Sequence, residues 1–456
     1  MASGKRKRQQ QDDLWVPAVQ LSRASGHPFY EELNRIFDAA GFDDELERLF
    51  APFYAGNKGR PGLAAGVYVR MLLVGYFEGI DSERGIAWRC ADSLALRRFL
   101  GLELRDDPPD HSTVSRTRRR IDLETHAEVF ALVLRILNEH GKISGKTVGI
   151  DATTLEANAA MKSLVRRDDG RSYDEFLTDL AKASGIETPT RAEKSRLDRK
   201  RKGKGSNDDW TNPNDPDAEI TKMKDGRTHL AHKLEQAVDL ESTAIVAARI
   251  APGAAGDTAT VGETLGLAIQ SVAELGAQVV ETVTDKGYHS NDVLEDAAFV
   301  GLRTYIAEPD RGRRNWKGKA EAKRAVYANR RRIRGKRGRA LQRRRAEVVE
   351  RRFAHCLETG GMRRAHLRGR ENIEKRYLVH ASGYNLGLVM REVFGKGTPR
   401  GLQGMKRLVE AVVAVCRAGM RAGFGRLRIW LRFDRAVGID RTLGIDALGA
   451  PFTTAC

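Results

Sequence analysis

Residues 281–296, ETVTDKGYHSNDVLED, place a carboxylate directly after an apolar run. The valines ahead of it, of which Val283 is the last, are typical of a buried strand, and Asp285 ends that strand before Lys286-Gly287-Tyr288. A carboxylate is costly to bury alone. Asp285 therefore indicates a functional edge of a sheet if other acids come to the same place.

A second acid holds the same kind of position. Residues 146–157, KTVGIDATTLEA, predict a strand that ends at Asp151. Between the two acids, residues 232–250 predict a hairpin, and residues 260–275 predict a helix by their apolar period. After Asp285 come a short helix near 292–300 and a further strand in LRTYIAEP. The order predicts an α/β fold with a mixed sheet flanked by helices.

The two aspartates predict a metal site if their strands are parallel neighbours. Both carboxylates would then reach one edge of the sheet, where open α/β sheets bind ligands. Two close carboxylates repel each other unless cations hold them ionised, and oxygen ligands without a Cys or His cluster suit Mg²⁺ or Mn²⁺. Glu350, beside a buried stripe in RRRAEVVERRFAHCLE, is a candidate third acid. The alternative is that each acid is a strand-end cap or a solvated helix residue.

Composition narrows the class of partner. The 456 residues carry a net charge of +18 with a pI near 9.8, and 41% of them are hydrophobic, which indicates a globular protein with a polyanionic partner. No run approaches the roughly 20 apolar residues of a membrane span, and no secretory signal is present. The four widely spaced cysteines indicate neither a zinc site nor a disulfide framework. We expect no membrane association and a cytoplasmic location.

The N-terminal third predicts a helical DNA reader. Residues 28–140 have the period of short helices, and residues 83–100 predict one that stops at Gly101. A Pro-rich turn follows, and then a basic helix that carries Arg116 and Arg119. Helix, turn and short basic helix is the order of a helix-turn-helix. The alternative is a surface helix with solvated arginines.

Basic charge is concentrated ahead of Glu350. Residues 311–345 hold 17 Lys and Arg and one acid, which predicts a basic insertion that touches DNA. Within it, Arg330, Arg331 and Arg332 are expected to neutralise phosphates. Trp316 would either stack on an unpaired base or pack on the core. Residues 190–218 are basic and then rich in Asn, Asp and Pro, which predicts a low-complexity loop.

These motifs together resemble the bacterial insertion-sequence DDE transposases from about residue 27 to 400. The blocks that carry the resemblance are GRPGLAAGVYVRMLLVGYFEGIDSERGIAWRCADSLALRRFLG, PDHSTVSRTRRRI, GIDATTLEANAAMKSLVRRDDG, KMKDGRTHLAHKLEQAVDL, VTDKGYHS, VERRFAH, GGMRRAHLRG and NLGLVMR. The resemblance implies a ribonuclease-H-like catalytic domain behind an all-α, helix-turn-helix-like domain. It also implies Asp151, Asp285 and Glu350 as catalytic metal ligands. Ala346 and Leu357 depart from the family's signature around the third acid, so Glu347 stays open as an alternative.

The resemblance further implies four segments and a reaction. We expect a flexible tail over 1–26, a helical DNA-binding domain over 27–140, a catalytic domain over 141–394 and a helical tail over 395–456. The implied reaction cuts double-stranded DNA at the ends of a mobile element and joins them to target DNA with Mg²⁺ or Mn²⁺, carried out by a homodimer in the nucleoid. The alternatives are a nuclease of the same fold that never joins ends, and a DNA-binding regulator.

Overall fold

The structure is a computed structural model that describes residues 26–402, apart from 56–61, 104, 202–204, 224, 225, 311, 313 and 365. The expected tail over 1–26 and most of the expected helical tail over 395–456 thus lie outside the described residues.

The N-terminal third is helical, as its apolar period predicts. The helices are α1 (Pro28–Ala39), α2 (Phe42–Phe50), η2 (Ala51–Phe53), α3 (Ala65–Glu78), α4 (Glu83–Asp92), α5 (Leu94–Phe99), α6 (His111–Arg120) and α7 (Leu123–Glu139). The single helix expected over 83–100 is broken at Ser93. The side chain of Ser93 accepts a hydrogen bond from Leu96 N at 3.3 Å, so Ser93 ends α4 and caps α5.

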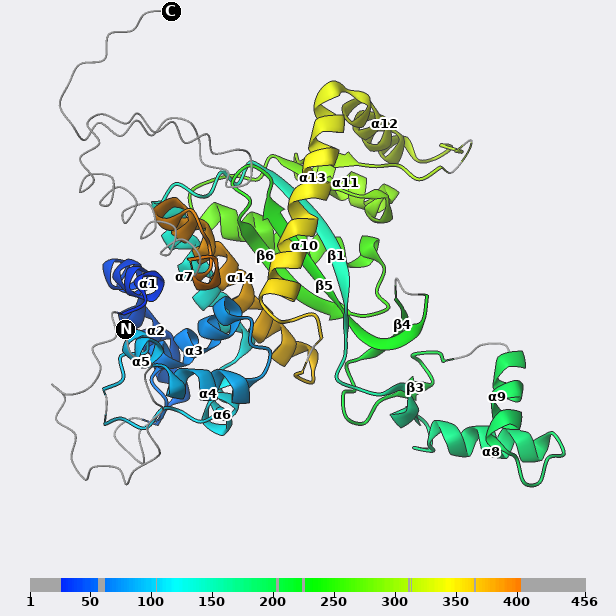
Figure 1. Ribbon diagram of the computed structural model, residues 1–456. Helices are drawn as coiled ribbons and strands as arrows, with labels where there is room; N and C mark the ends of the chain where they lie inside the picture. The colour runs from blue at the N-terminus through cyan, green and yellow to red at the C-terminus, as the bar shows by residue number, and fades with distance from the viewer. Residues whose placement is uncertain are drawn as a thin grey trace, which may run out of the picture. The chain divides into compact units, whose positions relative to one another are not determined.

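The sheet has the strand order β6-β5-β1-β7-β8, with β4 beside the start of β5 (Figure 1). Its strands are β1 (Thr147–Glu156), β4 (Glu219–Lys222), β5 (Thr228–Asp239), β6 (Ile245–Pro252), β7 (Glu281–Thr284) and β8 (Arg303–Ile306). The first three long strands are antiparallel neighbours, whereas β7 is parallel to β1 and β8 is parallel to β7. Three antiparallel strands followed by two parallel ones is the ribonuclease-H-like arrangement, which confirms the predicted fold class.

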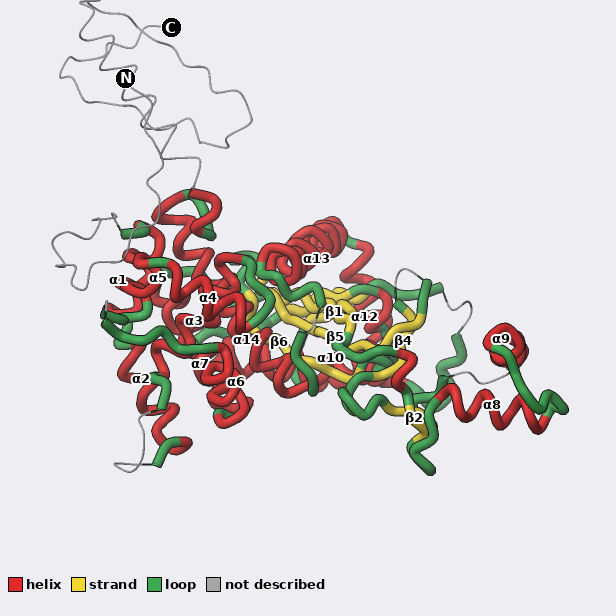
Figure 2. The backbone as a smooth tube through the Cα atoms, turned by 60° about the horizontal axis from the view of Figure 1, so that its bottom comes forward, coloured by secondary structure: helices red, strands yellow, loops and turns green. Residues whose placement is uncertain are grey.

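Helices cover the sheet and connect it to the N-terminal region. They are α10 (Asp257–Glu274), η4 (Lys286–Tyr288), α11 (Asn291–Phe299), α12 (Ala320–Arg334), α13 (Lys336–Ala354), the π-helical turn η5 (His355–Thr359), α14 (Arg370–Phe394) and η6 (Pro399–Leu402). Helix α14 lies between the sheet and helices α3 and α7 (Figure 2). Its Asn385 bonds both backbone groups of Ile245, at 2.8 and 2.9 Å. The helical region and the sheet therefore share one hydrophobic core.

A small module is inserted between β1 and β5. It contains η3 (Met161–Ser163), β2 (Val165–Arg166), α8 (Tyr173–Ala183), α9 (Arg191–Lys200) and β3 (Trp210–Thr211), around a separate core that includes Leu164 and Trp210. The loop expected over 190–218 was therefore wrong for its first part. Thr190 and Glu193 form a capping box that starts α9, and this local signal outweighs the low-complexity composition.

Residues 311–345 do not form a separate insertion either. They contain all of α12 and the first half of α13, the helix that carries Glu350. Ala322, Ala325, Val326 and Asn329 recur at helical spacing and bury one side of α12. The Asn329 amide bonds both backbone groups of Ile306 at 2.8 and 3.0 Å, which holds α12 against β8.

Candidate active site

Asp151 and Asp285 occupy equivalent positions on neighbouring parallel strands. The pairing of β1 with β7 ends at Gly149 and Val283, and each aspartate lies two residues further along its strand. The sequence predicted a strand that ends at Asp151, and this was wrong because β1 continues to Glu156 along β5. Asp285 follows β7 directly. The pairing of the two strands therefore ends just before both carboxylates, and beyond that point β1 pairs with β5 alone among the described strands.

The charge of Asp285 affects the pKa of Asp151. Arg345 Nη1 on α13 donates to Asp151 Oδ2 at 2.6 Å, and Ala152 N donates to Oδ1 at 2.8 Å. Burial raises the pKa of Asp151, and the charge of Asp285 raises it further, while Arg345 opposes both effects. Ionised Asp151 thus lacks full compensation within the protein, which is the state that a cation would relieve.

A buried hydrogen bond anchors the turn that carries Asp285. Asp285 Oδ1 accepts from Gly287 N at 2.8 Å at the start of η4. At the end of η4, the hydroxyl of Tyr288 donates to Glu235 Oε1 at 3.0 Å. Glu235 is fully buried on β5 and also accepts from Thr260 and Thr264 of α10. Sequence reasoning missed Glu235, although an acid inside the apolar run LEQAV is the signal that could have found it.

A further carboxylate lies beside the same turn. Lys233 Nζ pairs with Asp257 Oδ1 at 2.7 Å and donates to Thr260 Oγ1 at 2.9 Å. A Cβ placed on Gly287 would lie 2.3 Å from Asp257 Oδ2 and 3.1 Å from Asp285 Oδ1. Only glycine fits at position 287 without displacing a carboxylate, and Asp257 and Asp285 both line this turn.

The third predicted acid is less closely associated with the aspartates. Helix α13 crosses the sheet beside β1 (Figure 1), with Arg345 toward Asp151 and Val349 toward β5. Glu347 and Glu350 are both exposed, and Glu347 pairs with Arg351 at 3.0 Å. At about 100° per residue, Glu350 lies roughly 140° around the helix from Arg345 and Glu347 roughly 160°, so Glu350 is only about 20° nearer to the side that carries Arg345.

The structure brings two of the three predicted acids together. Within residues 26–402, leaving aside the undescribed positions, no group of three His, Cys, Asp or Glu side chains is placed to hold a metal ion. A pair of carboxylates nevertheless fits Mg²⁺, which proteins commonly bind through one or two carboxylates together with substrate phosphates. Asp151 and Asp285 supply such a pair.

The predicted DNA-contacting residues of α6 are accessible. Arg116 and Arg119 are exposed and lie three residues apart on one face of the helix, which Asp110 caps. Arg118 between them is instead buried, where it pairs with Glu83 and reaches Asn372 of α14. Helix α6 thus presents two arginines outward and is held in place by a third.

The basic residues of α12 divide into two groups. Arg330 forms a two-pronged pair with Glu308 at 2.6 and 2.7 Å, and Arg332 donates to the backbone and side chain of Thr304 at 2.8 and 2.9 Å. Arg331 between them is exposed. Two of the three arginines that were expected to contact phosphates, Arg330 and Arg332, therefore form contacts within the protein.

Trp316 is packed in the protein. Its ring lies edge-on to Tyr327 with centroids 6.1 Å apart, and the Arg314 guanidinium lies 4.5 Å from the indole centroid. This favours the core-packing alternative over base stacking. A hollow of about 670 Å³ near the junction of α12 and α13, here called the basic hollow, has four basic side chains in its lining, namely Arg334, Lys336, Arg339 and Arg343, together with Ala307, Ile333 and Gln342.

Comparison with known protein families matches both parts of the chain. Residues 18–120 match "Transposase domain (DUF772)", and residues 183–386 match "Transposase DDE domain". The chain belongs to the insertion-sequence DDE transposases. Asp285 and Glu350 fall within the second match, whereas Asp151 lies between the two. The protein is accordingly a DNA transposase, as its sequence motifs predicted.

Solved structures similar to this transposase include two titled "Mos1 transposase paired-end complex with left transposon end" and "Crystal structure of the Mos1 mariner paired end complex with Mn". Each is 10% identical and covers 73% of this chain and 93% of its own, with a TM-score of 0.19. The ribonuclease-H-like fold rests on the strand order and not on this likeness. Comparison with curated proteins gave no match. In the described part of the transposase, no helix is both long and apolar enough to cross a membrane.

Proposed function

We propose that this transposase cleaves double-stranded DNA at the ends of an insertion sequence and joins those ends to target DNA by metal-dependent phosphoryl transfer. The observation that supports the chemistry best is the equivalent placement of Asp151 and Asp285 where β1 and β7 part. Neither a regulator nor a structural protein needs two mutually repelling carboxylates at an open sheet edge, whereas a cation site does.

Asp151 and Asp285 would hold Mg²⁺ or Mn²⁺, with Glu350 as the third ligand. A bound cation supplies charge neutralisation at the phosphate and favours ionisation of the attacking hydroxyl or water. Burial raises the pKa of Asp151, and the Arg345 guanidinium opposes that effect and so favours the ionised carboxylate. The Tyr288–Glu235 hydrogen bond keeps Asp285 at the edge of the sheet.

DNA would be bound by the exposed basic residues. Arg116 and Arg119 on α6 are proposed to contact element ends, and Arg331 with the basic hollow is proposed to contact phosphates near the catalytic helix. Joining requires two ends to be held together, so we propose a homodimer on DNA. The proposed division of labour assigns end recognition to residues 27–140 and chemistry to 141–394, in a protein that acts in the nucleoid.

Single-residue variants test the catalytic assignment. Asp151→Asn, Asp285→Asn and Glu350→Gln should each abolish Mg²⁺-dependent cleavage of labelled element ends while leaving folding and DNA binding intact. Glu347→Gln is the matched control, since it removes a charge one turn away on the same helix. Loss in Glu347→Gln with full activity in Glu350→Gln would move the third ligand to Glu347. Full activity in Asp285→Asn would contradict the mechanism.

A strand-transfer assay separates the proposal from its alternatives. Wild-type protein, Mg²⁺, labelled element ends and a plasmid target should give joined products. Cut ends without joined products would indicate a nuclease of the same fold. Binding of ends with neither product would indicate a regulator.

A further inference from the structure

The module between β1 and β5 presents a pair of short helices, α8 and α9, which lies apart from the other helices (Figure 1). Each helix is started by a capping box, Ser172 with Glu175 on α8 and Thr190 with Glu193 on α9. The module follows the C-terminal end of β1, and Asp285 follows the C-terminal end of the parallel strand β7. The module and Asp285 therefore both follow the C-terminal ends of neighbouring parallel strands.

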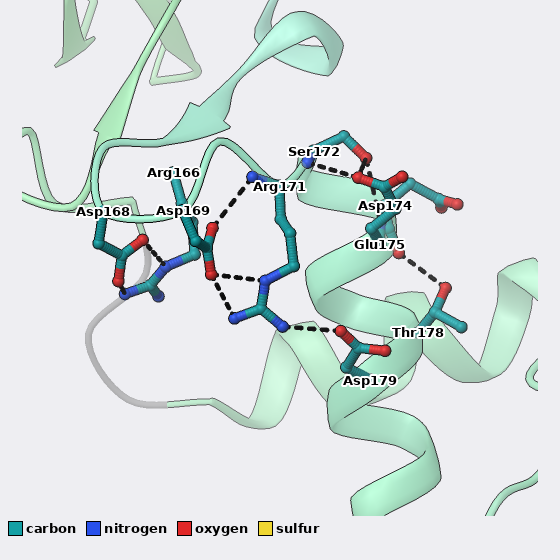
Figure 3. A network of polar contacts seen from close by, with 9 residues as sticks. All are labelled: Arg166, Asp168, Asp169, Arg171, Ser172, Asp174, Glu175, Thr178 and Asp179. Atoms are coloured by element: carbon teal, nitrogen blue, oxygen red, sulfur yellow. Dashed lines mark hydrogen bonds and ion pairs between the residues drawn. The ribbon is translucent and has the colours of Figure 1, made fainter.

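The acids just before and on α8 are paired with arginines of the same module. In Figure 3, Arg166 binds Asp168 through two contacts of 2.6 and 2.8 Å, and Arg171 lies between Asp169 and Asp179. The pKa of Asp169 is lowered by its bond to Arg171, which indicates that the pair is ionised. These acids are therefore paired with arginines of the module itself.

The acids on α9, and Asp174 on the neighbouring α8, also form hydrogen bonds within the module. Asp174 accepts from Lys194 at 2.9 Å, Asp198 accepts from the Tyr173 hydroxyl at 2.7 Å, and Glu193 is used by its capping box. Together with Leu197, these α9 side chains form the partly buried side of the helix. Every acid of α9 is thus turned toward the module.

The outer side of α9 is purely basic. Its exposed residues are Arg191, Ala192, Ser195, Arg196, Arg199 and Lys200. At about 100° per residue they cover one continuous half of the helix. Four cations on one face with only Ala and Ser between them leave room for a close approach to a polyanion. The bland alternative is a solvated surface.

We infer that this outer face of α9, defined by Arg191, Arg196 and Lys200, binds the phosphate backbone of duplex DNA. The helix is about 15 Å long, enough to follow several phosphates of one strand. The absence of any acid on the outer face favours this partner over a protein surface of mixed charge. This inference rests on the proposed DNA substrate and adds a binding surface beyond α6 and α12.

The test uses the full-length chain and two charge-matched variants. Arg196→Ala/Lys200→Ala removes two cations from the outer face of α9, and Lys162→Ala/Lys182→Ala removes two exposed cations from elsewhere in the module. Affinity for duplex DNA is measured by fluorescence anisotropy at several salt concentrations. The α9 variant should lower the slope of log K against log salt by about 1.8, at about 0.9 per lost contact. Between about 50 and 200 mM salt, wild-type affinity should then fall about 12-fold more than that of the variant.

The control variant should keep the wild-type slope, and Arg196→Lys should keep it as well, because a phosphate contact needs only the charge. A wild-type slope in the α9 variant, or equal loss in both double variants, overturns the inference while leaving cleavage by the wild type to support the proposed function. Salt-independent binding by the wild type itself overturns both. Thermal unfolding of each variant should match the wild type, since all these side chains are exposed.

Discussion

The hydrogen bond from Tyr288 to Glu235 offers the sharpest test of how the site is positioned. Tyr288→Phe removes one hydroxyl and keeps the ring, so no cavity forms. The lost bond is 3.0 Å long, and both side chains are buried. Burial and the charge of Glu235 raise the pKa of Tyr288 above its ordinary range, so the hydroxyl is a donor at every working pH. A hydrogen bond to a charged group contributes about 1.5–3 kcal/mol, which is the expected loss in unfolding free energy.

The same change should slow DNA cleavage beyond its effect on stability. Tyr288 ends the η4 turn that Asp285 begins, so losing the anchor lets the Asp285 carboxylate move. A misplacement on the order of 1 Å costs about 100-fold in rate. Tyr305→Phe is the matched control. Its hydroxyl donates to buried Glu281 Oε1 at 3.2 Å, at the opposite end of β7 from Asp285.

The assay combines urea unfolding with single-turnover cleavage of labelled element ends in saturating Mg²⁺, well below the unfolding midpoint. Both variants should lose similar stability, and only Tyr288→Phe should lose rate. Equal rates in the two variants would show that stability alone accounts for the loss. A wild-type rate in a destabilised Tyr288→Phe would show that the anchor does not position Asp285.

Three other results are expected. Because the pKa of Asp151 is raised, the folded state loses stability as pH rises through that pKa. Metal-free Asp151→Asn should therefore unfold at higher urea than the wild type near pH 8 and at equal urea below about pH 4. A constant difference in the unfolding midpoint at both pH values would contradict this. Arg331→Ala should lower the slope of log K for DNA binding against log salt by about 0.9 and leave stability unchanged. Arg330→Ala should instead reduce stability, because it loses its pair with Glu308. The reverse pattern would refute the assignment of Arg331 to DNA and of Arg330 to the protein. Arg116→Ala/Arg119→Ala in the whole chain should weaken the binding of element ends, as measured by gel shift. A fragment of residues 1–140 should be unfolded by circular dichroism, because α3 and α7 lose their packing against α14. A folded fragment that binds element ends would instead show an independent domain.

The sequence alone predicted the main strands and helices around the candidate site and pointed to Asp151 and Asp285 as candidate acids. Strand and helix periods are local properties, so the runs around Val283 and from residue 146 predicted two strands that are present, although β1 continues past Asp151 to Glu156. The order of those elements predicted a mixed α/β sheet, and the resemblance carried by the motif blocks implied the ribonuclease-H-like fold. Capping is equally local, and the Thr190–Glu193 box was visible in a stretch predicted to be a loop.

Only the tertiary structure decided which side chains meet. The equivalent placement of Asp151 and Asp285 depends on the register between β1 and β7, and the partner of Asp151 is Arg345, 194 positions away. Arg330, Arg331 and Arg332 are chemically equal in the sequence, yet two of them bind the protein and one faces outward. The physical reason is that a local pattern sets the backbone conformation of a segment, whereas burial, strand register and the choice of a charge's partner depend on segments that fold against it from elsewhere in the chain.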